Sequence, residues 1–566
     1  MTGNVVRGAF GSEEDGPPVW MIEADEEFYG SNQSSSDSAE SKRQHKRQPP
    51  RGPSGQGPVD YNRKPIMIRA GELHVMATEA ESALIAADTQ FFVRGGIVRP
   101  VIDELPASHG RRTKVARLLP IDANMLVDHL SRSTQFVKFN ARKKDWLPSD
   151  PPLNVAATIL AREGEWRFRP LSGVITAPTL RPDGSILSKA GYDPATRLLL
   201  LDPPTLPSMP DLPTRGDAVA AIDKLDRLLD GFPFVDDASR SVALSAMITP
   251  VVRGAMPVAP LHATSAPVAG SGKSYLIDIA STILTGDRAP VLAAGRNEEE
   301  TEKRLGAALL AGQPIVSIDN VNGELGGDSL CQMVERPVVS IRPLGVSKLI
   351  RIESRASIFA TGNNIRLVGD MTRRTLLCSL DPNLERPELR TFDSDPLEAV
   401  QADRGGYIGA ALTIVRAYML ADCPGQLPAL ASFETWSMMV RSALVWLGRV
   451  DPIKTMEAAR AEDPELTRLG GVMKTWHEAV GASSYTSGGI AALIDTRDPH
   501  GRLVYPDLIT ALLEVADNKR GGVDTRRLGQ FLGRSTNRIV DGLRFVSDTD
   551  THNSQKLWKV VRVSAG

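Results

Sequence analysis

A short run of glycine, serine and lysine constrains this chain more than any other segment. The run 270–274, Gly-Ser-Gly-Lys-Ser, follows a predicted strand at 261–264 and precedes an apolar helical run that begins at Tyr275. The two glycines permit a tight turn whose backbone N–H groups face phosphate oxygens, and the start of the helix adds its positive dipole end. The segment therefore predicts a P-loop, although Pro267 stands where the consensus has its first glycine.

The chemistry expected of this loop is the binding of ATP with Mg²⁺. The lysine reaches the β- and γ-phosphates, and the serine hydroxyl that follows it ligates the metal ion. The residues expected to bind the nucleotide are Gly270, Ser271, Gly272, Lys273 and Ser274.

An apolar strand further along the chain supplies the carboxylate that such a site requires. Residues 314–319 read Pro-Ile-Val-Ser-Ile-Asp, and Asp319 is predicted to be the Walker B residue that holds Mg²⁺ together with Ser274. Many ATPases of this kind carry a glutamate at the next position to polarise the attacking water, but here that residue is Asn320. An amide orients water without accepting its proton, so either another carboxylate acts or hydrolysis is slow. The alternative carboxylates are Glu300, Glu302 and Glu324.

Two later segments have the spacing expected of an ATPase core. Residues 338–352 contain two apolar runs around a Gly-Val-Ser-Lys turn, which predicts a β-hairpin. A third strand at 356–360 leads to Asn363, and a strand-end amide is suited to orienting water beside the γ-phosphate. The Arg373-Arg374 pair follows, where a guanidinium suits the γ-phosphate of a neighbouring subunit.

Composition narrows the class of protein. A length of 566 residues predicts three to four domains. No uninterrupted apolar run is long enough to span a membrane, the N-terminus is acidic where a signal peptide would be basic and apolar, and the three cysteines are widely spaced. We therefore expect a cytoplasmic protein without a membrane partner. The net charge is −2, but residues 519–566 hold ten Lys and Arg against four Asp, which indicates a local phosphate-contacting surface.

The order of these patterns predicts an α/β protein built from six segments. Short apolar runs at 65–68, 91–93, 96–98 and 198–201 alternate with helical patterns such as 77–86, which is typical of an α+β region. The predicted segments are a disordered tail at 1–65, an N-terminal α+β domain of unknown role at 66–205, a linker and helical lead-in at 206–250, the P-loop core at 251–385, a helical segment at 386–480 and a DNA-binding domain at 481–566.

The last segment has the pattern of a winged helix-turn-helix. The expected elements are a helix over 523–533 capped by Asp524 or Thr525, a turn over 534–537, a second helix over 538–543, and wing strands at 545–546 and 557–563. The second helix would enter a groove of duplex DNA, with Arg534 and Arg538 as contacts. Winged helices also pack against proteins, and the basic excess favours DNA here.

Taken in order, the P-loop, Asp319, the hairpin, the Thr-Gly-Asn-Asn run at 361–364 and the segment 370–374 resemble the ATPase core of AAA+ superfamily 3 and poxvirus-type helicases. More narrowly, the chain looks similar to primase–helicase-like replication proteins of bacterial phages, satellites and integrative elements. The motif match covers roughly residues 260–385. The primase centre that is fused to this core in such proteins is not visible in the sequence.

The resemblance implies a homo-hexamer that hydrolyses ATP at sites shared between subunits. One subunit gives Lys273 and Asp319, with Asn363 as sensor 1, and its neighbour gives an arginine finger, either Arg373 or Arg374. The hairpin would line a central pore around single-stranded DNA. Its expected contacts with DNA phosphates are Arg342 and Lys348.

Three functions fit these observations. The first is an ATP-dependent DNA translocase or helicase that acts in the replication of a mobile element. The second, favoured by Asn320, is an ATP-switched replication initiator or helicase loader that binds DNA without unwinding it. The third is a DNA-binding regulator or scaffold with a degenerate P-loop that binds no nucleotide.

Overall fold

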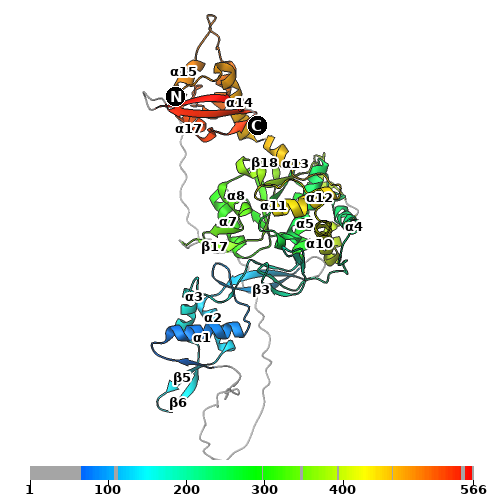
Figure 1. The fold of residues 1–566 in the computed structure, drawn as a ribbon, viewed down its shortest axis with the longest axis vertical. Helices are drawn as coiled ribbons and strands as arrows, with labels where there is room; N and C mark the ends of the chain where they lie inside the picture. Colours follow the sequence, from blue (N-terminus) through cyan, green and yellow to red (C-terminus); the bar gives the residue numbers. More distant parts are fainter. Residues whose placement is uncertain are drawn as a thin grey trace, which may run out of the picture. The chain divides into compact units, whose positions relative to one another are not determined.

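The computed structural model describes residues 65–106, 112–295, 298–343, 348–391, 394–461, 463–549 and 555–563. The predicted disordered tail lies outside this part, apart from residue 65. The described residues all belong to one compact unit that begins at Asn62, and Figure 1 follows them along the chain. The six segment boundaries drawn from the sequence remain predictions.

A five-stranded, all-parallel sheet forms the largest ordered element, as expected of a mixed α/β protein with a P-loop-like core. Its strand order is β14-β15-β18-β13-β19, so β18 lies between β13 and β15. All six residues of β13 are buried, because a parallel sheet is covered on both faces. The strands are β13 (Leu261–Ala266), β14 (Val291–Ala293), β15 (Ile315–Leu325), β18 (Ser357–Leu367) and β19 (Thr375–Ser379).

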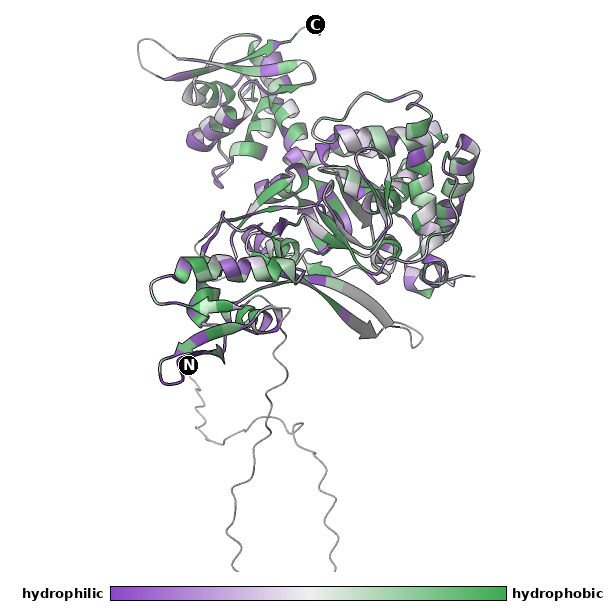
Figure 2. Cartoon of the chain, turned by 60° about the horizontal axis from the view of Figure 1, so that its bottom comes forward, coloured by the Kyte–Doolittle hydropathy of each residue, from purple (hydrophilic) through white to green (hydrophobic). Residues whose placement is uncertain are grey.

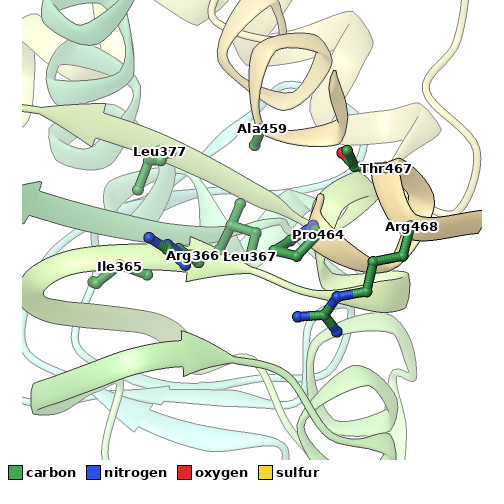
Figure 3. A pocket seen from close by; sticks show the side chains of 8 residues that line it. All are labelled: Ile365, Arg366, Leu367, Leu377, Ala459, Pro464, Thr467 and Arg468. Carbon is green, nitrogen blue, oxygen red and sulfur yellow. The ribbon is translucent and has the colours of Figure 1, made fainter. Parts of the chain in front are cut away.

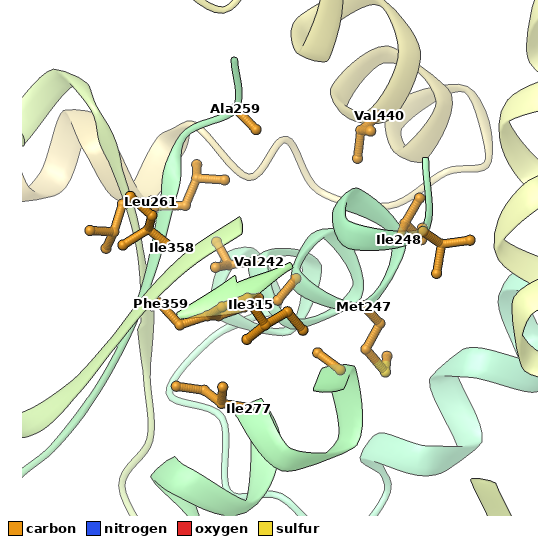
Figure 4. Packing of buried hydrophobic residues seen from close by; sticks show 14 of the residues in the cluster. Val242, Met247, Ile248, Ala259, Leu261, Ile277, Ile315, Ile358, Phe359 and Val440 are labelled. Carbon is orange, nitrogen blue, oxygen red and sulfur yellow. The ribbon is translucent and has the colours of Figure 1, made fainter. Parts of the chain in front are cut away.

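Helix α5 (Asp237–Val251) forms the centre of the hydrophobic core beside this sheet. It starts where the Asp236 carboxylate accepts a hydrogen bond from Ser239 N at 2.7 Å, and 13 of its 15 residues are buried. A helix that is buried over nearly all of its length must be surrounded by other elements. Figure 4 shows its neighbours in the core. The labelled core residues are Val242, Met247, Ile248, Ala259, Leu261, Ile277, Ile315, Ile358, Phe359 and Val440.

The helices around the sheet begin where the sequence offers capping residues. Thr214 and Asp217 form a capping box at the start of α4 (Arg215–Asp226), which packs on α10 (Arg404–Leu420). The region predicted to be helical after the core is helical. Besides α10, its helices are α9 (Pro396–Ala402), α11 (Glu434–Trp436), α12 (Ser442–Trp446), α13 (Lys454–Ala461) and α14 (Pro464–Val480). The helices that occur earlier, between the strands of the sheet, are α6 (Lys273–Thr285), α7 (Glu298–Leu310) and α8 (Asp328–Glu335).

Residues 65–161 mix short strands with helices, as their sequence pattern predicts, whereas the elements at 169–200 are all strands. Helices α1, α2 and α3 pack together (Figure 1). They share a hydrophobic cluster with Ile66 and Phe136 of the sheet β1-β5-β6. Asp122 accepts from Met125 N at 2.8 Å and caps α2. The elements are β1 (Ile66–Ile68), α1 (Leu73–Ala86), β2 (Phe92–Val93), β3 (Ile97–Pro106), β4 (Arg112–Pro120), α2 (Ala123–Ser133), β5 (Phe136–Asn140), β6 (Asp145–Ser149), α3 (Leu153–Ala161), β7 (Arg169–Pro170), β8 (Gly173–Ile175), β9 (Thr179–Leu180), β10 (Ile186–Leu187), β11 (Gly191–Asp193) and β12 (Leu198–Leu200).

The C-terminal elements correct one prediction. Asp524 caps α17 as expected, but the second helix expected over 538–543 is wrong. That segment contains β20 and a two-residue turn, Asp541-Gly542, at φ +49° and +72°. Asp-Gly with positive φ at both positions favours a tight hairpin over a helix. The elements here are α15 (Ser487–Ile494), α16 (Pro506–Ala516), α17 (Thr525–Ser535), β20 (Ile539–Val540), β21 (Leu543–Thr549) and β22 (Lys556–Arg562).

Many helices carry alternating hydrophobic and hydrophilic bands in Figure 2, as expected of elements with one side in a core and one side outside it. Across the described ranges, every helix is too short or too polar to cross a membrane.

Candidate nucleotide-binding site

The loop that follows β13 has the backbone conformation that its glycines were predicted to supply. Gly270 has φ +75° and Gly272 has φ +94°, and α6 begins at the next residue. A Cβ atom at Gly270 would lie 3.0 Å from the backbone N of Glu388, and one at Gly272 would lie 3.2 Å from the ring of Phe232. A larger residue at either position would therefore be strained and crowded.

The side chain of Lys273 folds back onto this loop. Its Nζ donates to the carbonyl of Val268 at 2.8 Å, and Ser271 Oγ donates to the same carbonyl at 2.7 Å. Burial lowers the pKa of Lys273, while the charge of Asp319 raises it. A half-buried ammonium that is bonded to a neutral carbonyl gains more from an incoming phosphate than a solvated one does.

The P-loop helix and the middle of β15 meet through two side chains. Ser274 Oγ donates to Asp319 Oδ1 at 3.3 Å. The hydroxyl of Thr361 on β18 also donates to this oxygen, and Asn320 N donates to Thr361 Oγ1 at 3.4 Å. A hydroxyl and a carboxylate oxygen fit Mg²⁺, which prefers oxygen ligands and keeps much of its water and phosphate coordination. Ser274 and Asp319 are therefore the side chains that would hold it.

Thr361 was missed by the sequence reading. The signal for it was present, since it is the first polar residue after the apolar run of β18 and stands next to Gly362. Its hydroxyl orients Asp319 from the neighbouring strand, which only the pairing of β15 with β18 reveals.

The sequence predicted a strand that ends at Asp319, but β15 does not end there. It continues to Leu325, with a register shift between Ile318 and Val321. Asn320 sits in this irregularity at φ +58°, a left-handed conformation that asparagine adopts more readily than most residues. The bulge turns the strand at the point where Asp319 meets the P-loop helix.

A cavity of about 740 Å³ adjoins Asp319 on the side of β14 and α7. It contains two of the carboxylates considered as replacements for the usual glutamate, namely Glu302 and Glu324. Glu302 accepts from Ser329 Oγ at 2.7 Å, whereas Glu324 is exposed and its side chain has no partner among the described residues. Glu300 is paired with Arg304 on α7 and does not line the cavity. Glu324 is therefore the candidate base that is free to reorient.

Asn363 is placed at the same edge of the sheet. It stands in register with Ala266, the last residue of β13, and with Asn322 on β15. Because β18 lies between those two strands, Asn363 lies between the strand that leads to the P-loop and the strand that carries Asp319. The half-buried position agrees with the predicted sensor role without testing it.

The two arginines predicted as fingers lie at the opposite end of β13. Thr375, which follows them, pairs with Leu261, whereas the P-loop follows Ala266. Six strand residues separate those ends by about 17 Å. Neither arginine is therefore placed to reach the loop at 270–274 of its own chain.

The environments of these two arginines differ. Arg374 is buried and forms ion pairs with Glu335 and, at 2.8 Å, with Asp370. Hydrogen bonds from Ser432 and Arg374 lower the pKa of Glu335. Arg373 is exposed and pairs only at the surface, with Asp370 at 3.2 Å. Arg373 is thus the arginine that is free to act on another molecule.

The predicted β-hairpin is present. Its strands β16 (Val338–Ile341) and β17 (Ile350–Glu353) pair in antiparallel register, and tip residues 344–347 lie outside the described part. Arg342 is exposed beyond β16. Lys348 is also exposed and forms an ion pair with Glu163, so a phosphate would have to displace a carboxylate there.

The basic C-terminal residues are arranged differently from the prediction. Arg534 is exposed in the last turn of α17, but Arg538 lies after the helix and pairs with Glu465 at 3.0 Å. Arg526 and Gln530, which the sequence reading missed, are exposed on α17 eight and four positions before Arg534, respectively. This i, i+4, i+8 spacing places the three side chains on one face of α17. The exposed basic face of this region therefore lies on α17 and not on the segment after it.

A second cavity of about 420 Å³ lies between strands β18 and β19 and helices α13 and α14 (Figure 3). None of the predicted site residues lines it. Its lining consists of Ile365, Arg366, Leu367, Leu377, Ala459, Pro464, Thr467 and Arg468.

Comparison with known proteins gives no family assignment. The sequence matches no protein-family model and no curated protein. Among solved structures, one described as the A-form apo structure of the NrS-1 C-terminal region has a TM-score of 0.34 and 10% identity, covering 79% of this chain and 100% of that chain. A second structure of that region has the same TM-score and identity and covers 78% and 100%. The resemblance is distant, and at this TM-score it supports no functional argument.

Proposed function

We propose that this chain is an ATP-dependent DNA translocase or helicase that acts in the replication of a phage or integrative mobile element. The observation that carries the proposal is the hydrogen bond between Ser274 and Asp319, with Lys273 and Asn363 at the same sheet edge. Together these groups supply a phosphate-binding loop, a pair of Mg²⁺ ligands and a water-orienting amide.

In this proposal each residue has a distinct task at the triphosphate. Lys273 leaves the carbonyl of Val268 and pairs with the β- and γ-phosphates. Ser274 and Asp319 hold Mg²⁺, which neutralises charge on those phosphates when it is bound. Asn363 and Asn320 orient the attacking water, and Glu324 accepts its proton.

The arginines support a site shared between subunits of a homo-hexamer. Because Arg373 lies about 17 Å from the edge that carries its own P-loop, it can neutralise transition-state charge only on a neighbouring subunit's ATP. Arg374 anchors the segment through Glu335 and Asp370 and presents Arg373 outward.

DNA would be contacted at two places. Arg342 and Lys348 flank the tip of the β16–β17 hairpin, which would face single-stranded DNA in a central pore. The face of α17 formed by Arg526, Gln530 and Arg534 would enter a groove of duplex DNA, with β21 and β22 as the wing.

A specific observation favours a second function. Asn320 occupies the position of the usual catalytic glutamate in a left-handed backbone conformation. If no other carboxylate replaces that glutamate, ATP binding would assemble the protein on DNA and slow hydrolysis would only reset it. This describes an initiator or helicase loader.

The deciding experiment measures ATP turnover and strand displacement by the full chain and its Lys273→Ala variant, with and without single-stranded DNA. Lys189→Ala, which removes an exposed lysine outside the loop, is the matched control. A translocase should show DNA-stimulated turnover and displacement of a forked duplex, both lost in Lys273→Ala. ATP-dependent DNA binding without displacement would identify the loader. Absence of ATP binding by calorimetry would reject both and leave a scaffold.

A further inference from the structure

The β5–β6 hairpin exposes two large aromatic side chains that the proposed ATPase does not use. Phe139 on β5 pairs directly with Trp146 on β6, and β6 is the edge strand of its sheet. The ring centroids lie 5.6 Å apart with an interplanar angle of 64°. Phe139 is 50% exposed and Trp146 is 37% exposed.

This aromatic pair lies outside the neighbouring hydrophobic core. The cluster that includes Phe136 contains neither ring. Exposed hydrophobic residues that occur singly need no explanation, whereas this cross-strand pair stabilises the hairpin and also leaves two adjacent rings exposed.

The turn that joins the two strands carries a group of cations. Arg142, Lys143 and Lys144 are exposed and form no ion pair within the described residues. The turn is ordered by Asn140, whose side-chain oxygen accepts from the backbone N of Arg142 at 3.0 Å and of Lys143 at 3.1 Å.

The other charged groups of the hairpin are few. Lys138 is also exposed on β5, but it directly precedes Phe139 and so lies on the opposite face of the strand. The one carboxylate of this segment, Asp145, accepts from the backbone N of Trp146 at 2.8 Å. The tip is therefore strongly positive beside two exposed π-faces.

We propose that this hairpin binds single-stranded nucleic acid. Bases would stack on Phe139 and Trp146 while Arg142, Lys143 and Lys144 contact the backbone phosphates. Stacking platforms beside cationic side chains are the recognition mode of single strands, whose bases are free to leave their own stack. The cations argue against a hydrophobic protein partner, and a duplex would keep its base faces covered.

This site goes beyond the proposed function because it needs neither ATP nor assembly. The hairpin belongs to the N-terminal region, for which the sequence suggested no role, and this region would bind the single strand. A motor with such a site would retain DNA between cycles of nucleotide exchange.

The test uses the full chain without nucleotide and fluorescence anisotropy of a labelled 20-nucleotide oligothymidine. The double variant Phe139→Leu/Trp146→Leu keeps apolar bulk and removes the π-faces, and we expect its Kd to rise roughly tenfold. The Lys143→Glu/Lys144→Glu variant should weaken binding and lower the salt slope by about 1.4, the value for two phosphate contacts on a single strand. Leu153→Ala, at an exposed apolar residue of the same region, is the matched control and should bind like wild type.

A localising readout removes the contribution of other DNA sites. Ultraviolet cross-linking of the same oligonucleotide carrying 5-iodouracil should recover the peptide that contains Trp146. The proposal is overturned if that peptide is not cross-linked, if the double leucine variant binds like wild type, or if a 20-base-pair duplex binds as tightly as the single strand. A change in assembly mass in the leucine variant with unchanged DNA binding would also overturn it, in favour of a protein contact. Lys273→Ala should retain this binding, so failure here and failure of the ATPase proposal are distinguishable.

Discussion

Ser274 and Asp319 stand 45 positions apart in the chain, and their side chains meet at 3.3 Å. Thr361 donates to the same carboxylate oxygen from β18, the strand that lies between β13 and β15. The P-loop helix and two strands of the sheet thus converge on one oxygen atom of Asp319. Small changes around that atom should alter ATP turnover before they alter ATP binding.

Thr361→Val should lower ATP turnover about tenfold with little change in the Kd for ATP. The variant removes a hydrogen bond to a charged group, which is worth about 1.5–3 kcal/mol, and frees Asp319 to rotate. Thr361→Ser keeps the hydroxyl and should retain most of the activity. Steady-state kinetics and ATP calorimetry check the pair, and equal loss in both variants would show that the methyl group matters instead.

Asn320→Glu should raise ATP turnover at least about tenfold, because a carboxylate accepts the proton that an amide cannot. Asn320→Gln is the matched control, because glutamine has the same length as glutamate but carries no charge. It should leave turnover at or below the wild-type rate. If Glu324 already serves as the base, Glu324→Gln should reduce wild-type turnover and Asn320→Glu should rescue it. Unchanged turnover in both Asn320→Glu and Glu324→Gln would reject a proton-accepting role for either position.

Arg373→Ala and Arg374→Ala should fail in different ways. Arg373 is exposed, so its loss should reduce turnover by about 10³-fold or more without affecting stability. Arg374 is buried between Glu335 and Asp370, and its loss should lower the free energy of unfolding by about 3 kcal/mol. Urea unfolding and ATPase assays separate the two effects.

Mixing two inactive variants tests whether Arg373 acts between subunits. Lys273→Ala retains the arginine and Arg373→Ala retains the P-loop, so mixed assemblies would contain some complete sites. We expect turnover to reappear on mixing at equal concentrations. No recovery, despite exchange of subunits, would argue that Arg373 does not act on the neighbouring site.

Arg526→Ala/Arg534→Ala should weaken binding to duplex DNA and lower the salt slope by about 1.8, the value for two phosphate contacts. Arg538→Ala is the informative control because Arg538 already pairs with Glu465 and lies after α17. Anisotropy titrations at several salt concentrations measure both quantities. A larger loss in Arg538→Ala than in the double variant would return the DNA contact to the segment that follows the helix.

His262 should make the core sensitive to acid. Its Nε2 lies 2.9 Å from Ser245 Oγ, and burial lowers its pKa to about 3. The unfolded pKa is about 6.5, so the folded state favours the neutral ring and stability is lost as pH falls from about 6.5 towards 3. Between pH 7 and 5, wild type should lose about 2 kcal/mol more in the free energy of unfolding than His262→Gln, which cannot titrate. Equal losses in urea unfolding would show that other groups govern acid stability.

The sequence was sufficient to predict elements whose signals are local. The glycine turn at 270–274, the buried strands on either side of it and the cap at Asp524 each depend on a few neighbouring residues, and the structure has them. The failed prediction was local too. Asp541-Gly542 is a hairpin signal, but the apolar spacing of 538–543 was read as a helix.

Other features depend on which strands lie side by side, and no local pattern contains that information. The sequence by itself determined that this chain has a glycine-rich turn between a strand and a helix, an acid in an apolar strand and a pair of arginines. Only the tertiary structure decided that β18 inserts between β13 and β15, which brings Thr361 to Asp319. It also decided that Arg374 is buried while Arg373 is exposed, since burial depends on Glu335, which lies 39 positions away. Pairing between distant segments is set by packing of the whole core, so these relationships exist only once the chain has folded.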